Sequence, residues 1–276
     1  CDIKKGDRVF FFSTCGWMMW NWLVSSLASG ATLMLYDGSP FIKNNDNILF
    51  DYAEQEKFNF MGVSAKYLDT ARKKALSPRK THNLDSIKMI LSTGSALSVD
   101  CYDYVYEKVK AEVCLSSISG GTDIVSCFVL GSPMLPVYRG ELQTRGLGMA
   151  VEVWDENGKS VINKKGELVC IKTFPSKPTG FWNDEGDSKY RQSYFERYPN
   201  VWCHGDYVSL NQHGGMVFHG RSDTTLNRGG VRIGTAEIYR QVEKLKEVLE
   251  SVVVEQNYKD ETRIILFVKL IDGLLI

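Results

Sequence analysis

Two short segments, Leu91–Ser98 and Ser116–Asp123, each include the end of an apolar run and carry small and hydroxyl-bearing residues suited to a ligand-binding turn, and the second has residues suited to phosphate and Mg²⁺. The first contains three small residues in succession, Gly94, Ser95 and Ala96. The second ends in two glycines followed by Thr122 and Asp123. Glycine lets backbone N–H groups approach a phosphate closely, a hydroxyl donates a hydrogen bond, and a carboxylate can hold Mg²⁺. An ordinary turn after a strand is the alternative for each segment taken alone.

A third group of candidate residues, between His204 and Arg232, combines acids, arginines and glycines. Its members are Asp206, Arg221, Asp223, Gly230 and Arg232. A guanidinium presents a rigid fork of donors, so arginines and a carboxylate on short loops can hold ribose hydroxyls and phosphate oxygens. The paired glycines beside them permit a swing of the backbone. The alternative is a solvated hairpin whose salt bridges each contribute only ~0–1 kcal/mol.

The elements expected around the first two segments form a mostly parallel sheet with flanking helices. Short apolar runs alternate with longer helix-like stretches up to about residue 130, which is typical of an α/β fold. The predicted strands cover residues 9–13, 32–36, 59–64, 87–92 and 113–118. The clearest predicted helix covers residues 99–109, and Ser98 is expected to cap its first turn. Ligands bind at the carboxyl edge of such a sheet, where both segments would lie.

Beyond residue 130 the pattern changes to short strands joined by tight polar turns. This predicts an antiparallel, barrel-like subdomain over residues 131–220, in which Val161 and Ile162 form a strand. Residues 221–276 are expected to contain a hinge and the start of a small α+β C-terminal domain. Its helix is predicted from an apolar stripe formed by Ile238, Val242, Leu245 and Leu249, and strands are expected at 252–254 and 264–268.

Composition narrows the classes of partner. Lysine plus arginine number 33 and aspartate plus glutamate number 33, so nothing points to a nucleic acid or a membrane surface, and a small-molecule partner is expected. The most apolar stretch, Trp17–Leu27, is shorter than the ~20 residues that span a bilayer. Seven cysteines without a CxxC pair predict free thiols in a reducing compartment, the cytosol. No cysteine and histidine spacing predicts a metal cage.

In their order and separations, the three groups of candidate residues resemble the adenylate-forming superfamily of acyl-CoA synthetases, luciferases and peptide-synthetase adenylation domains. Within that superfamily, five segments resemble the ligases that act on acetoacetate. They are Ser13–Trp22, Ser117–Ile124, Thr144–Glu152, Phe181–Glu185 and His204–Tyr207. The resemblance implies an enzyme that joins acetoacetate to AMP, releasing pyrophosphate from ATP. A small C-terminal domain then swings so that coenzyme A displaces AMP.

The resemblance also implies a role for each candidate residue. Gly94, Ser95 and Ala96 would lie against the adenine. Thr122 would bond phosphate, Asp123 would hold Mg²⁺, and Arg232 would reach the phosphates. Asp206 and Arg221 would hold the ribose hydroxyls. Asp223 would be the hinge, and Gly230 would lie where the thiol tunnel closes on the backbone. Trp17 and its neighbours would border the acyl-binding part of the site.

The sequence departs from the family pattern at several points. Asp123 stands where Glu is usual, and Ser119 replaces an aromatic residue. The family's Gly-x-Pro-Lys phosphate loop would belong upstream of Cys1 and its lysine-bearing Gly-Lys segment downstream of Ile276, and the chain begins without Met and ends in an apolar run. We therefore expect both ends to lie within a longer chain. The alternative function is a catalytically silent fragment that binds nucleotide weakly or not at all, and a third hypothesis is a luciferase-like or peptide-synthetase adenylation domain.

Overall fold

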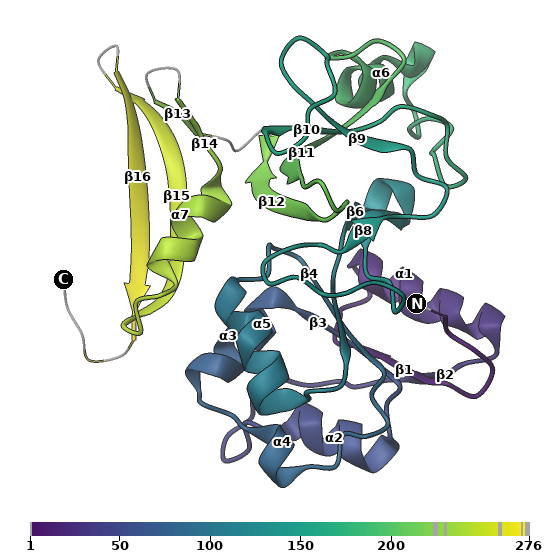
Figure 1. Cartoon of the computed structure of the whole chain (residues 1–276), viewed down its shortest axis with the longest axis vertical. Helices are drawn as coiled ribbons and strands as arrows, with labels where there is room; N and C mark the ends of the chain where they lie inside the picture. The colour runs from purple at the N-terminus through teal and green to yellow at the C-terminus, as the bar shows by residue number, and fades with distance from the viewer. Residues whose placement is uncertain (1, 223–225, 229–230, 259–260, 272, 274–276) are drawn as a thin grey trace. The chain divides into compact units, whose positions relative to one another are not determined.

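The chain forms two compact units in the computed structural model, which describes residues 2–222, 226–228, 231–258, 261–271 and 273 (Figure 1). Unit 1 comprises Cys1–Met149, Thr173–Thr179 and Gly214–Met216. Unit 2 comprises Ala150–Lys172, Gly180–His213 and Val217–Ile276. Each unit carries one part of the candidate site. The boundaries predicted at residues 130 and 220 stay predictions.

Unit 1 is built on a five-stranded parallel sheet with the order β2-β1-β3-β4-β5. The strands are β1 (Arg8–Phe11), β2 (Thr32–Met34), β3 (Phe60–Ser64), β4 (Met89–Thr93) and β5 (Cys114–Ser117). All five occupy the predicted positions, with small differences at their ends. The parallel pairing confirms the predicted sheet. The prediction worked because short apolar runs are typical of parallel strands that helices cover on both faces.

Helices cover both faces of this sheet. They are α1 (Met18–Ser25), α2 (Ile48–Glu56), α3 (Ala65–Lys73), α4 (Pro78–Thr81) and α5 (Val99–Tyr104), with the short helices η1 (Ser26–Ser29), η2 (Val105–Val109) and η3 (Thr122–Ile124). Alternation along β1 divides the core, since Phe10 packs with α2, α3 and α5 while Val9 and Phe11 pack with α1. The two clusters fix β4 and β5 from opposite sides.

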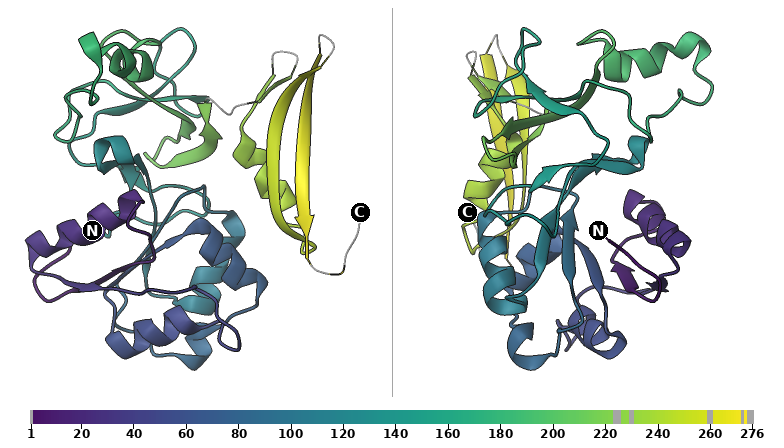
Figure 2. Two further views of the ribbon diagram at one scale, coloured as in Figure 1. Left: turned by 180° about the vertical axis from the view of Figure 1, so that it is seen from behind. Right: turned by 45° about the vertical axis from the view of Figure 1, so that its right-hand side comes forward.

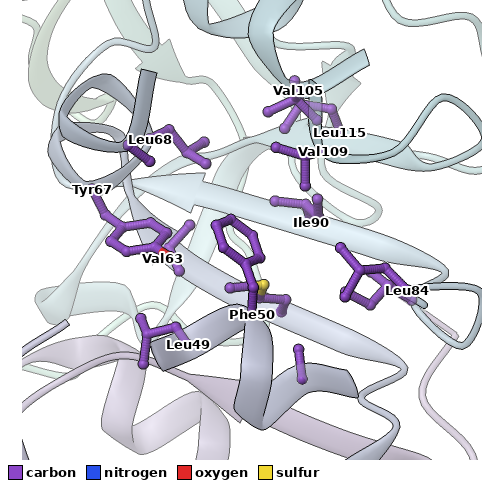
Figure 3. Close-up of a cluster of buried hydrophobic side chains, with 14 of the residues drawn as sticks. Leu49, Phe50, Val63, Tyr67, Leu68, Leu84, Ile90, Val105, Val109 and Leu115 are labelled. Atoms are coloured by element: carbon purple, nitrogen blue, oxygen red, sulfur yellow. The ribbon is translucent and has the colours of Figure 1, made fainter. Parts of the chain in front are cut away.

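The larger of these clusters is drawn in Figure 3. Helices α2 and α3 and the η2 segment contribute Leu49, Phe50, Tyr67, Leu68, Val105 and Val109, and the strands contribute Val63, Ile90 and Leu115. Every one of these side chains is buried. Full burial of a side chain of this size contributes ~1.5–3 kcal/mol, so the cluster holds the helices against β4 and β5.

The predicted helix over residues 99–109 exists, but its second half, η2, is a π-helix. The predicted cap is wrong. Ser98 has the extended backbone of an N-cap residue, yet its hydroxyl makes no capping hydrogen bond and lies buried with no partner among the described residues. The Cys101 N–H donates instead to the Ser98 carbonyl, 3.0 Å away, so the backbone takes the place expected for the side chain.

A second, three-stranded sheet of unit 1 follows the parallel one. Its order is β6-β7-β8, with β6 (Ser119–Gly121), β7 (Ser126–Leu130) and β8 (Thr144–Arg145) paired antiparallel. Strand β6 starts two residues after β5 ends. The chain therefore leaves the parallel sheet directly into this hairpin, and η3 with Thr122 and Asp123 is the turn between β6 and β7.

Unit 2 contains a four-stranded sheet with the order β12-β11-β10-β9. The strands are β9 (Val151–Trp154), β10 (Lys165–Cys170), β11 (Trp202–Leu210) and β12 (Met216–Arg221), and the helices between β10 and β11 are η4 (Glu185–Asp187) and α6 (Ser188–Phe195). Strand β10 pairs antiparallel with both β9 and β11, which confirms the predicted antiparallel character. Tyr194 of α6 stacks on Trp202 with ring centroids 3.8 Å apart and fastens the helix to the sheet.

The strand predicted at Val161 and Ile162 is wrong. The Val161 N–H donates to the Val153 carbonyl at 2.8 Å, but the chain then leaves β9. Asn163 adopts φ +58°, which turns the backbone, and its N–H donates to the carbonyl of Leu210 on β11. A single left-handed residue thus ends the pairing that the apolar pair predicted.

The C-terminal part of unit 2 consists of two hairpins and a helix (Figure 2). They are β13 (Leu226–Arg228) with β14 (Val231–Ile233), α7 (Thr235–Val242), and β15 (Val248–Tyr258) with β16 (Glu261–Leu270). Both predicted strands fall within β15 and β16. The predicted helix is too long, because turns after Val242 end it, Leu245 is exposed and Leu249 belongs to β15.

The cysteines of the described residues, Cys15, Cys101, Cys114, Cys127, Cys170 and Cys203, are free thiols, as predicted. Burial raises the pKa of Cys127 to about 12, so this thiol stays protonated at neutral pH. Within the described part of the chain, every helix is too short or too polar to cross a bilayer.

Candidate functional site

The turns after β4 and β5 lie side by side at the carboxyl edge of the parallel sheet. Strand β4 pairs in parallel register with β5 as far as Ser92 and Ser117. One residue later, the Thr93 hydroxyl donates to the Ile118 carbonyl at 3.2 Å. The structure therefore brings the first two predicted segments together, at the edge where an open parallel sheet binds its ligands.

The residues presented at this edge are small and accessible. Gly94 has φ +89°, a conformation that favours glycine, and the space where a Cβ would stand is open for 4 Å. Gly94 and Ser95 are exposed and Ala96 is half-buried. Thr122 and Asp123 are exposed as well. This edge can offer a ligand backbone N–H groups, a hydroxyl and a carboxylate with little rearrangement.

The backbone next to Thr122 and Asp123 is tightly constrained. A Cβ at Gly120 would lie 2.0 Å from the Ser126 carbonyl oxygen, so only glycine fits between β6 and β7. Val125 has φ +46°, which is rare for a β-branched residue and costs ~1–3 kcal/mol. Its carbonyl accepts a hydrogen bond from Trp22 Nε1 at 3.3 Å. Sequence reasoning missed the link between Trp22 and Val125.

A cavity of about 280 Å³ lies within unit 1, between α1, the parallel sheet and β7. It is lined by Ile3, Phe11, Trp22, Ser25, Ser26, Ser29, Leu91, Ser116, Ile118, Ser126, Cys127 and Leu130. Apolar side chains dominate, and the polar groups are mainly hydroxyls. A cavity of this kind suits a small, mostly apolar group that carries a hydrogen-bond acceptor.

The third predicted group is represented in unit 2 by an ion pair. Arg221 Nη1 donates to Asp206 Oδ1 at 3.0 Å and to the His204 carbonyl at 3.0 Å. Gly205, with φ +79°, makes room for it, since a Cβ there would lie 2.8 Å from Arg221 Nη2. The Asp206 side chain is 5% exposed and that of Arg221 is 47% exposed. The carboxylate and the carbonyl thus orient the guanidinium of a half-exposed arginine.

A buried acid that the sequence did not single out lies beside this pair. Glu167 of β10 is 1% exposed, and its two oxygens accept hydrogen bonds from Arg197 Nη1 and Ser222 Oγ. The sequence did carry a signal for this residue, because Glu167 directly precedes the apolar run Leu168–Cys170 of a predicted strand. A buried strand tolerates a carboxylate only when the carboxylate is paired.

Three predicted residues cannot be placed in full. Asp223 and Gly230 lie outside the described residues. Arg232 belongs to β14, where its backbone pairs with Asn227, and its side chain lies outside the described part. Their roles stay predictions.

The donor set at the edge of unit 1 fits Mg²⁺ carried by a phosphate ligand. Among the described residues, no three acids, histidines or cysteines gather into a metal cage. Mg²⁺ usually takes one or two carboxylates and completes its shell with water and substrate phosphates. One exposed carboxylate, Asp123, next to the Thr122 hydroxyl suits that arrangement.

Comparison with known proteins identifies the family. A family model described as AMP-binding enzyme matches residues 1–174. The chain belongs to the AMP-binding enzyme family. The family resemblance predicted from its motifs is confirmed, and the matched span contains the edge formed by β4 and β5.

Two relatives of this AMP-binding enzyme are acetoacetyl-CoA synthetases. The chain is 58% identical over 273 residues to acetoacetyl-coenzyme A synthetase of Rhizobium meliloti, which covers 99% of this chain and 42% of that protein. Against acetoacetyl-CoA synthetase of Rattus norvegicus the identity is 51%, over 99% of this chain and 41% of the relative. The chain thus spans about two fifths of the length of these curated relatives.

Two solved structures share the fold. Acetoacetyl-CoA synthetase from Streptomyces lividans aligns with a TM-score of 0.91 and 42% identity, covering 100% of this chain and 42% of that chain. An anthranilate CoA ligase in complex with anthranoyl-AMP aligns with a TM-score of 0.80 at 18% identity, over 99% of this chain and 51% of that chain. The predicted α/β architecture with antiparallel additions is confirmed.

Proposed function

We propose that these residues form the nucleotide- and acyl-binding part of an ATP-dependent acetoacetate–CoA ligase. In the first step a carboxylate oxygen of acetoacetate attacks the α-phosphorus of ATP, and the bond to pyrophosphate breaks. In the second step the thiolate of coenzyme A attacks the acyl carbon, and AMP leaves. The observation that carries the proposal is the 58% identity over 99% of the chain with an acetoacetyl-coenzyme A synthetase.

The edge of unit 1 serves the phosphates and the adenine in this proposal. The Gly94-Ser95-Ala96 turn lies against the adenine, and the Thr122 hydroxyl donates to a phosphate oxygen. Mg²⁺, when bound, neutralises charge on the phosphates, and Asp123 is the residue that holds it. The accessibility of Gly94, Ser95, Thr122 and Asp123 supports these roles.

Unit 2 serves the ribose and the domain rotation. Asp206 and Arg221 hold the ribose hydroxyls, and the 47% exposure of the Arg221 side chain supports a direct contact. Arg232 reaches the phosphates, and Gly230 lines the thiol tunnel. Asp223, within the part proposed at 221–276, is the hinge, and the residues that follow it rotate between the two steps, relative to the parts proposed at 1–130 and 131–220.

The cavity beside α1 is the proposed place for the acyl group. Its apolar walls suit the short carbon chain of acetoacetate, and its hydroxyls can donate to the 3-oxo oxygen. We further propose a cytosolic enzyme, supported by the six free thiols of the described residues.

The test uses two proteins, because the chain spans 42% of the Rhizobium meliloti relative. One is the 276-residue chain itself, and the other is a chimaera in which this chain replaces the matching span of that relative. Acetoacetate-dependent exchange of pyrophosphate into ATP measures the first step, and acetoacetyl-CoA formation measures both. We expect the chimaera to prefer acetoacetate to acetate at least about 10-fold, the effect of one satisfied hydrogen bond in the acyl site.

The controls separate the alternatives. Equal exchange with acetate and acetoacetate in the chimaera contradicts the substrate, and exchange only with aromatic or amino acids favours a luciferase-like or peptide-synthetase function. An active chimaera beside a 276-residue chain without exchange supports the alternative that these residues alone are catalytically silent. Isothermal titration of that chain with ATP then measures whether it binds nucleotide.

A further inference from the structure

Arg221 and Ser222, the two residues that precede the proposed hinge, each donate a hydrogen bond to a buried carboxylate. Arg221 is held by Asp206 of β11, as described above. Ser222, the next residue, donates its hydroxyl to Glu167 Oε2 of β10. The two carboxylates come from neighbouring strands of one sheet and hold Arg221, the last residue of β12, and Ser222, the residue after it. This arrangement lies immediately before the position proposed as the hinge.

The contacts of the Glu167 carboxylate restrict its motion. It is almost fully buried, and its other oxygen, Oε1, accepts a hydrogen bond and an ion pair from Arg197, which follows α6. Cys203 Sγ lies 3.9 Å from Oε2. The Arg197 guanidinium is in turn seated 5.4 Å from the centre of the Tyr198 ring. A buried carboxylate with both oxygens engaged has little freedom to move.

Glu167 also affects the neighbouring thiol. Burial and the negative charge of Glu167 raise the pKa of Cys203 to about 11. An ionised carboxylate accepts stronger hydrogen bonds than a neutral oxygen, so it holds Ser222 more firmly than a carbonyl would. The position of Ser222 therefore depends on a charge 55 residues away in the sequence.

We infer that Glu167 is a positioning residue that fixes the stationary side of the hinge through Ser222. The inference rests on the proposed function, since it assumes that rotation after Ser222 separates the two steps. With the hydroxyl of Ser222 anchored, the dihedral change falls on the residues that follow, and the C-terminal domain turns about one defined point. Without the anchor the end of β12 moves too, and the orientation needed for the thiol step is reached less often.

Ser222→Ala is the decisive variant, because it removes only the hydroxyl from a half-buried residue and spares the pair of Glu167 with Arg197. In the chimaera we expect the ratio of acetoacetyl-CoA formation to pyrophosphate exchange to fall about 10-fold, the effect of losing one hydrogen bond to a charged group. Ser222→Thr keeps a hydroxyl and should restore the ratio. Glu167→Gln should lower it similarly, and the double variant should fall no further than either single one.

A matched control comes from the same unit. Ser193 of α6 donates its hydroxyl to the Lys189 carbonyl at 2.8 Å in an accessible position, so Ser193→Ala should leave the ratio within about 2-fold of the starting protein. Amide hydrogen exchange of residues 217–222 provides a second readout. Ser222→Ala should speed exchange there while leaving β9 and β10 protected.

The possible results separate this inference from the proposed function. An active chimaera whose Ser222→Ala variant keeps the ratio overturns the role of Glu167 and leaves the ligase function standing. Equal losses in both steps also overturn it, because they indicate a merely structural residue. A chimaera without pyrophosphate exchange overturns the proposed function and this inference together.

Discussion

The two candidate sites are built by opposite means. At the edge of unit 1 the functional groups are exposed and held by backbone geometry, as the left-handed Gly94 and the close approach at Gly120 show. In unit 2 the groups are charged, and buried carboxylates hold them, as Asp206 and Glu167 show. One site depends on the shape of the chain and the other on paired charge.

Because of this difference, substitutions at the two sites should affect ligand binding and folding stability differently. Replacing an exposed carboxylate such as Asp123 removes a ligand contact and little folding energy, because surface substitutions usually change stability by about 0.5 kcal/mol or less. Removing a partner of buried Asp206 costs both, since a buried charge left unpaired is expensive. Substitutions of the exposed side chains of unit 1 should therefore lower activity without changing the melting temperature, and substitutions in the charged site of unit 2 should lower both.

The sharpest test of unit 1 is Asp123→Ala. We expect the rate of pyrophosphate exchange in the chimaera to fall about 10²–10³-fold, as for the loss of one electrostatic contact to the reacting phosphates. The melting temperature should stay within 1–2 °C, or about 0.5 kcal/mol. Asp123→Glu, which keeps the carboxylate, should retain most of the activity. Full activity in the alanine variant would show that Asp123 is a turn residue only.

Arg221→Ala makes the corresponding test in unit 2. We expect the KM for ATP to rise about 10–100-fold, because a charge-assisted hydrogen bond contributes ~1.5–3 kcal/mol. The melting temperature should also fall, since Asp206 remains buried without the guanidinium. Arg221→Lys keeps the charge but not the fork and should recover only part of each. An unchanged KM with a lowered melting temperature would reduce the pair to a structural one.

Two glycines of unit 1 compare steric with conformational demand. Gly120→Ala should destabilise the protein by about 1–3 kcal/mol, because its Cβ meets backbone atoms of Ser126 and Cys127 that cannot move aside alone. Gly94→Ala meets no atom and carries only the penalty of a positive φ, about 1 kcal/mol. Melting temperatures of the two variants decide the order. The reverse order would show that β6 and β7 separate easily.

The fold was predictable where local signals agree with tertiary structure. The five parallel strands follow from apolar runs, and the edge formed by Gly94 and Thr122 follows from where those runs end. Sequence reasoning failed where the outcome depends on a competing contact. Asn163 turns the chain out of a predicted strand, and the Ser98 carbonyl replaces its hydroxyl in capping.

The charged site of unit 2 was only half predictable. Asp206 and Arg221 lie in short motifs, so the resemblance pointed to both residues, but their ion pair became known only from the structure. Glu167 was missed because its partners, Arg197 and Ser222, are 30 and 55 residues away, and no local pattern joins them. Buried networks of this kind are specified by topology, whereas the turns of unit 1 are specified by glycine.

The smallest expected effect concerns the pH dependence of unit 2. His219 of β12 is buried, its Nε2 lies 3.0 Å from the Ser209 hydroxyl, and its Nδ1 has no partner among the described residues. Burial lowers its pKa from 6.5 to about 4, and Lys165 and Arg240 act in the same direction against Glu237. The unfolded chain therefore takes up this proton at a higher pH than the folded one. The stability that His219 contributes is complete above pH 6.5 and is lost as the pH falls toward 4.

One unit of pKa difference corresponds to about 1.4 kcal/mol, and partial solvent screening reduces this energy. We therefore expect the free energy of unfolding to fall by about 1–2 kcal/mol between pH 7 and pH 4 because of His219. His219→Gln keeps a donor for Ser209 but does not titrate, and it is the matched control. Melting temperatures of the two proteins, measured across this range, isolate the histidine from the carboxylates that titrate in both. The advantage of the starting protein over His219→Gln should shrink as the pH falls from 6.5 to 4. An advantage that is constant with pH would mean that His219 titrates alike in the folded and unfolded chain, and that charge does not distinguish unit 2 at this position.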